Sequence, residues 1–291
     1  MKILAFDIGG TEIKFCLCDE SFNLTEKKSI PTNAHEGGKR IIERVIEIIK
    51  TFDSIDRIGI STAGQVDSSK GEIIYATDSI PGYTGTKIKE AIEAETGIPT
   101  AVENDVNSAA IGEAIFGAAK GFSSFICLTY GTGIGGAIYL DGELFTGNSF
   151  SSGEFGHMVT HAGGKSCTCG GNGCYEAYAS ASALVSTVNE TLGVSMNGRE
   201  IFDNFKNPEI RRIIDEWIDE IVIGLKSLVY IFNPSLIVAG GGIMNEIYIT
   251  NEINARLQKE LMASFRKVKV VKALMGNDAN KLGAAYLASK L

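Results

Sequence analysis

The chain has 291 residues, of which 44% are hydrophobic and 21% are charged, as is usual for a globular protein. Its net charge of −8 argues against nucleic acid as the main partner, because nucleic-acid-binding surfaces are basic. No apolar run is long enough to span a membrane, and Met1 leads into a strand-like run without a signal peptide. We therefore expect a cytoplasmic protein that binds neither membrane nor nucleic acid.

Hydrophobic periodicity and turn residues predict alternating strands and helices. Strands are expected at residues 2–7, 12–18, 24–30, 57–61 and 100–103, and helices at 38–50, at 87–96 and from 104 or 105 onward. The pattern restarts with strands at 123–129, 137–140, 143–146, 236–239 and 268–271, and with helices at 176–190, 210–232 and 279–288.

A strand, a glycine turn and a second strand occur near the start of the chain and again near its middle. This repetition predicts two related lobes, residues 1–118 and 119–278, with a cleft between them. The C-terminal helix, at about residues 279–291, is expected to pack back on the first lobe.

The segment 153–176 carries two His, three Cys and two Glu among many glycines. One imidazole and three thiolates form a closed tetrahedral set of the structural zinc type, and glycines let the backbone fold back to bring them together. The predicted ligands are His157, Cys167, Cys169 and Cys174. The alternatives are small buried thiols, or a disulfide with an odd Cys left over. A bound metal would also fix the direction of the two flanking carboxylates, Glu154 and Glu176.

The first glycine turn follows Asp7 and contains Gly9 and Gly10. Its backbone N–H groups are unobstructed by side chains and therefore suit phosphate oxygens. Asp7 could hold Mg²⁺ through water, and Thr11 and Lys14 could add hydrogen-bond donors. An ordinary tight hairpin is the alternative interpretation.

The second glycine turn, residues 131–136, contains a literal GxGxxG at Gly131, Gly133 and Gly136. A dinucleotide-binding fingerprint requires a helix after the glycines, whereas a strand is expected here. The turn is therefore interpreted as a second phosphate-binding hairpin.

Residues 103–107 lie between a short strand and a helix start. When this segment is considered alone, capping of the following helix by Asn104 or Asp105 is enough to explain its polar residues. The two glycine turns and the carboxylate-rich loop favour a functional role instead.

These motifs together resemble the ROK family (Repressor, ORF, Kinase) of sugar kinases, within the actin/hexokinase/Hsp70 superfamily, over essentially the whole chain. The matching segments are DxGGTxxK at 7–14, END at 103–107, GTGIGGA at 131–137, GExGH at 153–157 and CxCGxxGCxE at 167–176. Residues 61–67 (STAGQVD) lack the proline that the family often has at this point, in a loop on the sugar side that includes Gly64.

The resemblance implies an α/β protein with the two-lobed, actin-like ATPase (ribonuclease H-like) fold and a mixed sheet with flanking helices in each lobe. It implies an ATP-dependent hexose kinase that uses Mg²⁺, carries structural Zn²⁺ on the four ligands predicted above, and forms a homodimer. Asp105 would be the general base, accepting a proton from a sugar hydroxyl, most simply the 6-hydroxyl. The implied sugar-binding residues are Asn104, Asp105, Glu154, His157, Glu176 and Gly64, and the implied ATP-binding residues are Asp7, Gly9, Gly10, Thr11, Lys14, Gly131, Thr132, Gly133, Gly241 and Gly242.

Glucose or an N-acylated hexosamine such as N-acetylmannosamine is the expected sugar, with a β-glucoside or fructose as alternatives. A non-catalytic sugar-sensing regulator and an acyl-phosphate-forming kinase remain as alternatives of other classes.

Overall fold

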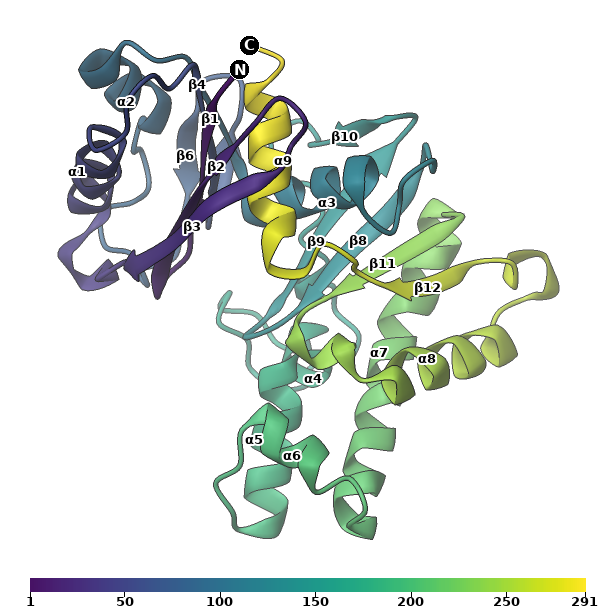
Figure 1. Ribbon diagram of the computed structural model, residues 1–291. Helices are drawn as coiled ribbons and strands as arrows, with labels where there is room; N and C mark the ends of the chain where they lie inside the picture. The colour runs from purple at the N-terminus through teal and green to yellow at the C-terminus, as the bar shows by residue number, and fades with distance from the viewer. The chain divides into compact units, whose positions relative to one another are not determined.

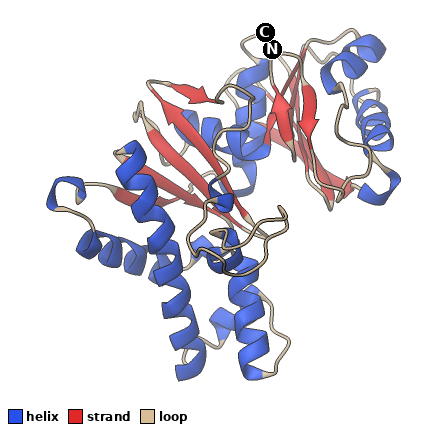
Figure 2. Ribbon diagram, turned by 180° about the vertical axis from the view of Figure 1, so that it is seen from behind, coloured by secondary structure: helices blue, strands red, loops and turns tan.

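The structure is a computed structural model that describes all 291 residues. The chain forms two compact units: residues 1–121, 144–152 and 274–291 make unit 1, and residues 122–143 and 153–273 make unit 2. In each unit, helices flank a sheet that mixes parallel and antiparallel strands, which confirms the predicted fold class (Figures 1 and 2). None of the helices combines the length and the apolar character needed to cross a bilayer.

The sheet of unit 1 has the strand order β3-β2-β1-β4-β7. Its strands are β1 (Ile3–Ile8), β2 (Glu12–Cys18), β3 (Leu24–Pro31), β4 (Arg57–Thr62) and β7 (Thr100–Asn104). β1 pairs with β2 in antiparallel fashion, whereas β1, β4 and β7 run parallel to one another. The carboxyl ends of these three strands therefore meet at one edge of the sheet, which is where ligands bind in open α/β sheets.

Helices cover both faces of this sheet (Figure 1). The helices are α1 (Gly38–Ile49), α2 (Ile88–Thr96), α3 (Asp105–Phe116) and α9 (Ala279–Ala288), and the short turns η1 (Ala34–Glu36) and η5 (Gly276–Asp278) precede α1 and α9. Because successive strand residues point to opposite faces, Leu4, Phe6 and Ile8 share a core with α1 and α2, while Ile3 and Ala5 pack against α9. Cys16 and Cys18 of β2 are buried in that second core.

A small hairpin outside the main sheet of unit 1 was not expected from the sequence. It pairs β5 (Gln65–Asp67) with β6 (Glu72–Tyr75) in antiparallel fashion. The first strand, β5, has only three residues and lies in a stretch rich in turn-forming residues. It is too short for an alternating hydrophobic pattern to predict it.

The sheet of unit 2 has the strand order β10-β9-β8-β11-β12. Its edge strand β10 (Glu143–Phe145) begins at the last residue of the segment 122–143, where the chain passes to the segment 144–152 of unit 1. The other strands are β8 (Phe125–Tyr130), β9 (Ile134–Leu140), β11 (Leu236–Gly240) and β12 (Lys269–Lys272). Its helices are α4 (Glu176–Ala179), α5 (Ala181–Leu192), α6 (Gly198–Asp203), α7 (Pro208–Phe232) and α8 (Ile247–Glu260), with short turns η2 (Phe155–His157), η3 (Gly242–Asn245) and η4 (Ala263–Phe265). One continuous core joins Ile126 and Leu128 of β8 to Ile214 and Ile221 of α7.

The structure corrects the single helix predicted at 176–190. Ser180 adopts an extended conformation and divides the segment into α4 and α5. The Ser180 hydroxyl accepts the N–H of Ala183 and caps α5, and its carbonyl accepts the indole N–H of buried Trp217. The polar groups of Ser180 at this break therefore remain hydrogen-bonded. The spacing of hydrophobic residues in the sequence does not reveal such a break.

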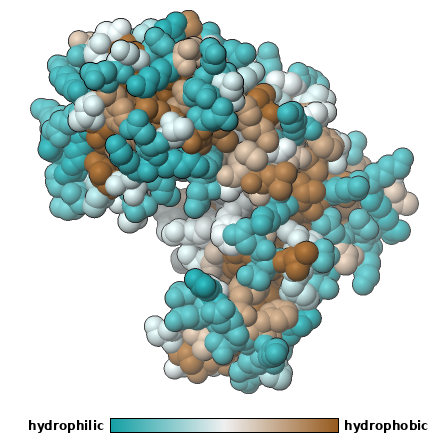
Figure 3. All heavy atoms as spheres, viewed as in Figure 1, coloured by the Kyte–Doolittle hydropathy of each residue, from teal (hydrophilic) through white to brown (hydrophobic).

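Hydrophilic residues cover most of the surface in the space-filling view, and apolar residues form scattered patches (Figure 3). The most exposed large apolar side chains include Ile231 and Ile247 of unit 2. Single exposed apolar residues of this kind are common on globular proteins.

Candidate functional site

Three polar segments of unit 1 meet at the carboxyl edge of its parallel strands. Asp7 of β1 lies opposite Ser61 of β4, and Ser61 lies opposite Glu103 of β7. Asn104 and Asp105 follow immediately, at the junction of β7 and α3. The topology therefore brings the predicted Mg²⁺ residue and the predicted general base to one edge.

Asn104 is the N-cap of α3, as the capping interpretation expected. Its side-chain oxygen accepts the N–H groups of Val106 (2.9 Å) and Asn107 (3.1 Å). Its amide nitrogen donates to the carbonyl of Gly64 and to Asp105 Oδ1, both at 2.9 Å. All the usual hydrogen-bonding positions of the Asn104 side chain are thus filled within unit 1. In this arrangement Asn104 holds Asp105 in place, and a direct bond to a ligand would replace one of these contacts.

Asp105 combines an oriented carboxylate with altered acidity. Its Oδ1 accepts hydrogen bonds from Asn104 and from the N–H of Val106 (2.9 Å), which leaves Oδ2 as the oxygen able to accept a proton. Burial and, secondly, the nearby Asp7 charge raise the pKa of Asp105 to about 6, although its hydrogen bonds oppose this shift. A base is most effective when its pKa lies near the working pH, so this carboxyl group suits proton transfer at neutral pH.

Glu103, by contrast, has a supporting role. It is buried and accepts the N–H of Asn104 (2.8 Å) and the amide of Asn107 (3.0 Å). Burial raises the pKa of Glu103, while its hydrogen bonds oppose that shift. The acidic residue that opens the segment 103–107 therefore stabilises the strand–helix junction.

The first glycine turn joins β1 to β2 as a hairpin, as predicted. The N–H of Gly9 donates to the carbonyl of Glu12 at 3.0 Å, and a side chain at Gly10 would meet nothing within 4 Å. Gly10 and Thr11 are exposed, and the Lys14 ammonium lies 4.0 Å from Glu12. The turn offers accessible backbone next to Asp7, whose carboxylate accepts hydrogen bonds from Ser61 and Asn280.

The second glycine turn joins β8 to β9 in unit 2 and is followed by a strand, so the rejection of a dinucleotide fingerprint is confirmed. The turn borders a cavity of about 900 Å³ that lies within unit 2. Gly131 and Gly242 line this cavity together with residues of α5 and α6. Gly241 has a φ of +106°, and any side chain there would collide with the carbonyl of Tyr130.

The helix α6 forms part of the wall of this cavity through Gly198, Arg199 and Phe202. This helix was not predicted from the sequence. A signal was present: the Asn197 side chain accepts the N–H of Glu200 and the Glu200 carboxylate accepts the N–H of Asn197, which is a capping box. That pattern marks a helix start even for a helix of six residues.

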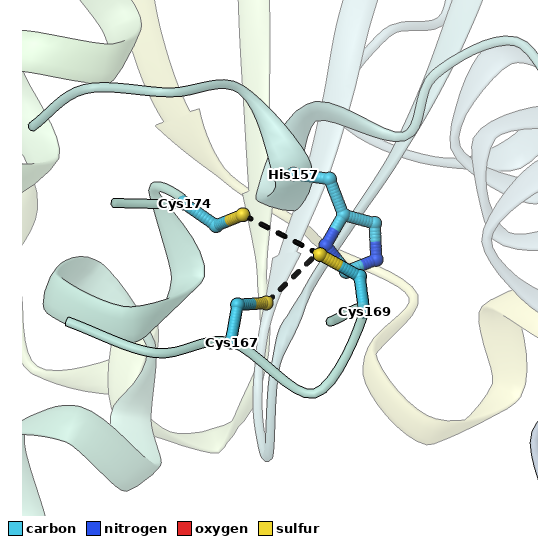
Figure 4. Close-up of side chains that lie close together, drawn as sticks. All are labelled: His157, Cys167, Cys169 and Cys174. Atoms are coloured by element: carbon cyan, nitrogen blue, oxygen red, sulfur yellow. Dashed lines mark hydrogen bonds between the residues drawn. The ribbon is translucent and has the colours of Figure 1, made fainter. Parts of the chain in front are cut away.

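The structure brings together the four predicted metal ligands of unit 2 (Figure 4). One potential ligand atom from each of His157, Cys167, Cys169 and Cys174 lies within 4.8 Å of all the others. His157 Nδ1 is 3.6 Å from Cys167 Sγ, and Cys169 Sγ is 3.6 Å from Cys174 Sγ. None of the six cysteines of the chain forms a disulfide in the structure, and the three thiols of this loop lie around the His157 ring instead. The cluster is a candidate metal site.

Glu176 connects the metal-ligand loop to the second glycine turn. Its Oε1 lies 3.2 Å from Cys167 Sγ, and its Oε2 accepts the N–H of Ile134 at 3.3 Å. A side chain at Gly133 would collide with Oε2, so glycine is needed for this close approach. Glu154 is exposed at the start of the same loop.

A second set of contacts, which the sequence did not predict, joins this loop to the helices α4 and α7. The His161 ring stacks on Tyr178, with centroids 4.0 Å apart, and His161 Nε2 lies 3.6 Å from Glu220 of α7. The Tyr178 hydroxyl accepts the N–H of Lys165 at 2.6 Å. These contacts tie the middle of the loop to α4 and α7.

The ROK family model matches residues 3–291 of the chain. A β-glucoside kinase from Listeria innocua is 34% identical, with 98% of this chain and 97% of that protein covered. A glucokinase from Streptomyces coelicolor is 31% identical, with 98% and 96% covered. The crystal structure of a ROK family glucokinase from Streptomyces griseus in complex with glucose and AMPPNP superposes with a TM-score of 0.86 at 28% identity, covering 100% of both chains.

Proposed function

The chain belongs to the ROK family, and on that basis we propose that it is an ATP-dependent kinase that transfers the γ-phosphate to a hydroxyl group of a hexose. The observation that carries the proposal is the Asp105 carboxylate, oriented through Oδ1 and with its pKa raised to about 6, beside Asp7 at the strand edge. We assign the transfer to the 6-hydroxyl, the primary alcohol of a hexose.

In the proposed reaction Asp105 Oδ2 accepts the proton of the sugar hydroxyl as the hydroxyl oxygen attacks the γ-phosphorus in line. The bond between that phosphorus and the bridging oxygen breaks, and ADP is the leaving group. A carboxylate is a sufficient base, because a loose phosphoryl-transfer transition state requires only modest proton removal. Most of the rate enhancement would come from positioning and from the neutralisation of phosphate charge by backbone N–H groups. Removal of water from the reacting groups would limit ATP hydrolysis.

We propose that the sugar hydroxyls are bound by polar side chains at the strand edge of unit 1 and on the metal-ligand loop of unit 2. Unit 1 contributes Asn104 and Asp105, with Gly64 as the neighbouring backbone, and unit 2 contributes Glu154, His157 and Glu176. His157 can serve both the metal and the sugar because its two ring nitrogens are distinct, and Nδ1 is the nitrogen that lies near the thiols.

We propose that ATP occupies the cavity of unit 2, with its phosphates at the glycine turns. The residues assigned to it are Asp7, Gly9, Gly10, Thr11, Lys14, Gly131, Thr132, Gly133, Gly241 and Gly242. The cavity volume of about 900 Å³ is in the range of cofactor-sized sites. Mg²⁺ would neutralise charge on the ATP phosphates, and the Asp7 carboxylate is a hard oxygen ligand of the type that Mg²⁺ or its bound water prefers.

We propose Zn²⁺ as the metal of the His157 site. Ligand atoms in a tetrahedral site with Zn–S bonds of about 2.3 Å are about 3.8 Å apart, close to the two separations of 3.6 Å found here. With three thiolates and one imidazole the coordination is complete, so the ion would support the loop and take no part in the reaction.

The relatives carry different substrate names, including glucokinase, β-glucoside kinase and N-acetyl-D-glucosamine kinase. We propose glucose or an N-acylated hexosamine as the substrate, with a β-glucoside or fructose as the alternative. A coupled ADP-release assay with a panel of these sugars tests the proposal. ATP turnover that depends on one of them supports it, whereas sugar binding without turnover would indicate the sugar-sensing regulator. We further propose that the protein is cytoplasmic and that it forms a homodimer. Light scattering on the purified protein would check the homodimer.

A further inference from the structure

The cavity of unit 2 is bordered by two groups of elements that are distant in the chain (Figure 1). Helices α5 and α6 form one group, which includes Val185 and Phe202, and the turn η3 with the residue before α8 forms the other, which includes Ile243 and Glu246. α6 packs against α5, and η3 packs against α8. Contacts between the two groups therefore determine how wide the cavity is.

Arg211 makes such a contact together with two aromatic rings. It is the fourth residue of α7, and its guanidinium carbon lies 4.4 Å from the ring centroid of Phe205 and 4.2 Å from that of Tyr248. Phe205 follows the end of α6, and Tyr248 is the second residue of α8. The two rings meet edge to face, with centroids 4.8 Å apart and an angle of 61° between their planes. One guanidinium group thus holds the end of α6 against the start of α8.

The contact reaches the cavity through Phe202. The Phe202 ring stacks on that of Phe205, with centroids 6.3 Å apart, and Phe202 lines the cavity. α6 has only six residues, and an isolated helix of this length is not stable in water. Its position therefore depends on tertiary contacts. Buried Ile201 supplies one of them in the core, and the contact between Phe205 and Arg211 supplies another beyond the end of the helix.

The α8 side of the contact is fixed independently of Arg211. The Tyr248 hydroxyl donates to Asp215 Oδ1 at 2.5 Å, and Arg256 donates both to that oxygen and to the Asp215 carbonyl, at 2.6 Å each. Arg256 also pairs with Asp219 of α7 at 2.8 Å. Because these bonds join α8 to α7 without Arg211, loss of Arg211 would release mainly the end of α6.

The geometry at position 211 suits an arginine and not merely a positive charge. Arg211 Nη2 donates to the Tyr248 hydroxyl at 2.9 Å, and Nε lies 3.4 Å from Asp215 Oδ2, while the guanidinium group also lies over two rings. A planar guanidinium can stack and donate at the same time, whereas a lysine ammonium is a compact point charge. Each cation–π contact at an exposed site is weak, but here one group makes two of them.

We propose that Arg211 is a positioning residue for the nucleotide: through Phe205 and Phe202 it fixes the α6 wall of the cavity relative to the η3 wall, so that the site is ordered before ATP binds. The inference rests on the proposed kinase function and its assignment of ATP to this cavity. An ordered site binds more tightly, because fewer side chains have to be immobilised at the moment of binding. Arg211 is not among the residues that line the cavity, so it acts on the nucleotide through its neighbours.

Arg211→Ala tests this role. It removes both ring contacts, and we expect KM for ATP to rise about three- to tenfold, as when about one further side chain must be ordered on binding. The dissociation constant of the ATP analogue AMPPNP, measured by calorimetry, should rise equally. kcat and KM for the sugar should change little, because the proposed base and sugar-binding residues take no part in this contact. Arg211→Lys keeps the charge without the planar group and should give an intermediate rise.

Arg212→Ala is the matched control. Arg212 is the next residue of α7, is exposed like Arg211 and pairs with Glu216 at 2.5 Å, one turn along the helix. The control removes the same charge from the same helix and leaves the contact of Arg211 with the two rings intact. It should bind AMPPNP as the parent does. An equal loss of AMPPNP affinity in Arg211→Ala and Arg212→Ala would overturn the inference, because it would reflect charge alone.

Hydrogen exchange of the nucleotide-free protein measures the order of the α6 wall directly. The amides of residues 199–205 should exchange faster in Arg211→Ala than in the parent or in Arg212→Ala. Faster exchange with parent-like AMPPNP affinity would overturn the inference, because the contact would then be structural alone. Weaker AMPPNP binding with parent-like exchange would also overturn it, since Arg211 would not act by ordering α6.

The kinetic constants complete the test. A rise in KM for the sugar or a fall in kcat as large as the effect on ATP would overturn the inference, because the change would then be general. If Arg211→Ala fails to fold, parent-like AMPPNP affinity in Arg211→Lys overturns it. AMPPNP binding without sugar-dependent turnover in the parent would instead reject the kinase proposal and leave the role of Arg211 in nucleotide binding intact.

Discussion

Glu176 Oε2 accepts the N–H of Ile134 at 3.3 Å, which joins the metal-ligand loop to the glycine turn between β8 and β9. The same carboxylate contacts Cys167 through its other oxygen. The Glu176 carboxylate, which we propose binds the sugar, is therefore held by the candidate metal site through one oxygen. Its other oxygen is held by the turn that we assign to the ATP phosphates. This coupling predicts that changes in the turn alter sugar affinity.

Gly133→Ala tests that coupling. Its Cβ would collide with Glu176 Oε2, so the carboxylate must move, and we expect KM for the sugar to rise by about tenfold. Gly131→Ala is the matched variant in the same turn, where a Cβ meets nothing within 4 Å. Gly131 lines the cavity, so its variant should change KM for ATP more than KM for the sugar. Equal effects of the two variants on both constants would contradict the coupling.

Asp105→Asn tests the proposed base. We expect kcat to fall by roughly 10²- to 10⁴-fold, because the amide cannot accept the proton, while sugar affinity by calorimetry is largely retained. Asp53→Asn, at an exposed aspartate in the loop between α1 and β4, is the control for the loss of one charge. Turnover near that of the parent in Asp105→Asn would remove this residue from the mechanism.

The raised pKa of Asp105, about 6, also predicts a pH dependence of stability. An unfolded aspartate has a pKa near 3.9, so as pH rises from about 4 to about 6 the unfolded chain loses its proton first. The contribution of Asp105 to the free energy of unfolding is therefore greatest at low pH. It falls as pH rises from about 4 to about 6 and stays lower at higher pH. Asp105→Asn should remove the fall and raise the melting temperature at neutral pH by several degrees, relative to the parent. Identical pH–melting curves for the two proteins would show that this carboxyl group is not perturbed.

Local patterns predicted much of this structure, because strands, glycine turns and metal ligands each depend on residues close together in sequence. The hairpin at Gly9 and Gly10 and the cap at Asn104 are of this kind. The contact between Asp7 and Asn280 spans 273 residues, and no local pattern encodes it. It depends on how closely α9 packs against β4 and α3. The glycines Gly59 and Gly283 permit this close packing, because a Cβ at either position would collide with a backbone carbonyl.

Two elements of unit 2 were missed for different reasons. The helix α6 is short and is marked mainly by its capping box. In α8 the buried residues Ile249, Ile253 and Leu257 recur every four positions, but β-branched residues at its start obscure that helical spacing. Burial against the core of unit 2 outweighs the weak helix preference of this segment.

The proposed zinc site predicts that metal, loop stability and sugar affinity are lost together. Cys169→Ser weakens one of the four ligands, and we expect a loss of bound zinc, a fall in melting temperature of at least about 5 °C and weaker sugar binding. Elemental analysis, thermal melting and calorimetry measure the three effects, and chelator treatment of the parent should reproduce them. Cys18→Ala is the contrasting variant, since this thiol is buried in the core of unit 1 and should affect melting alone. A Cys169→Ser protein that loses zinc yet binds sugar as the parent does would show that the metal-ligand loop does not position the sugar-binding carboxylates.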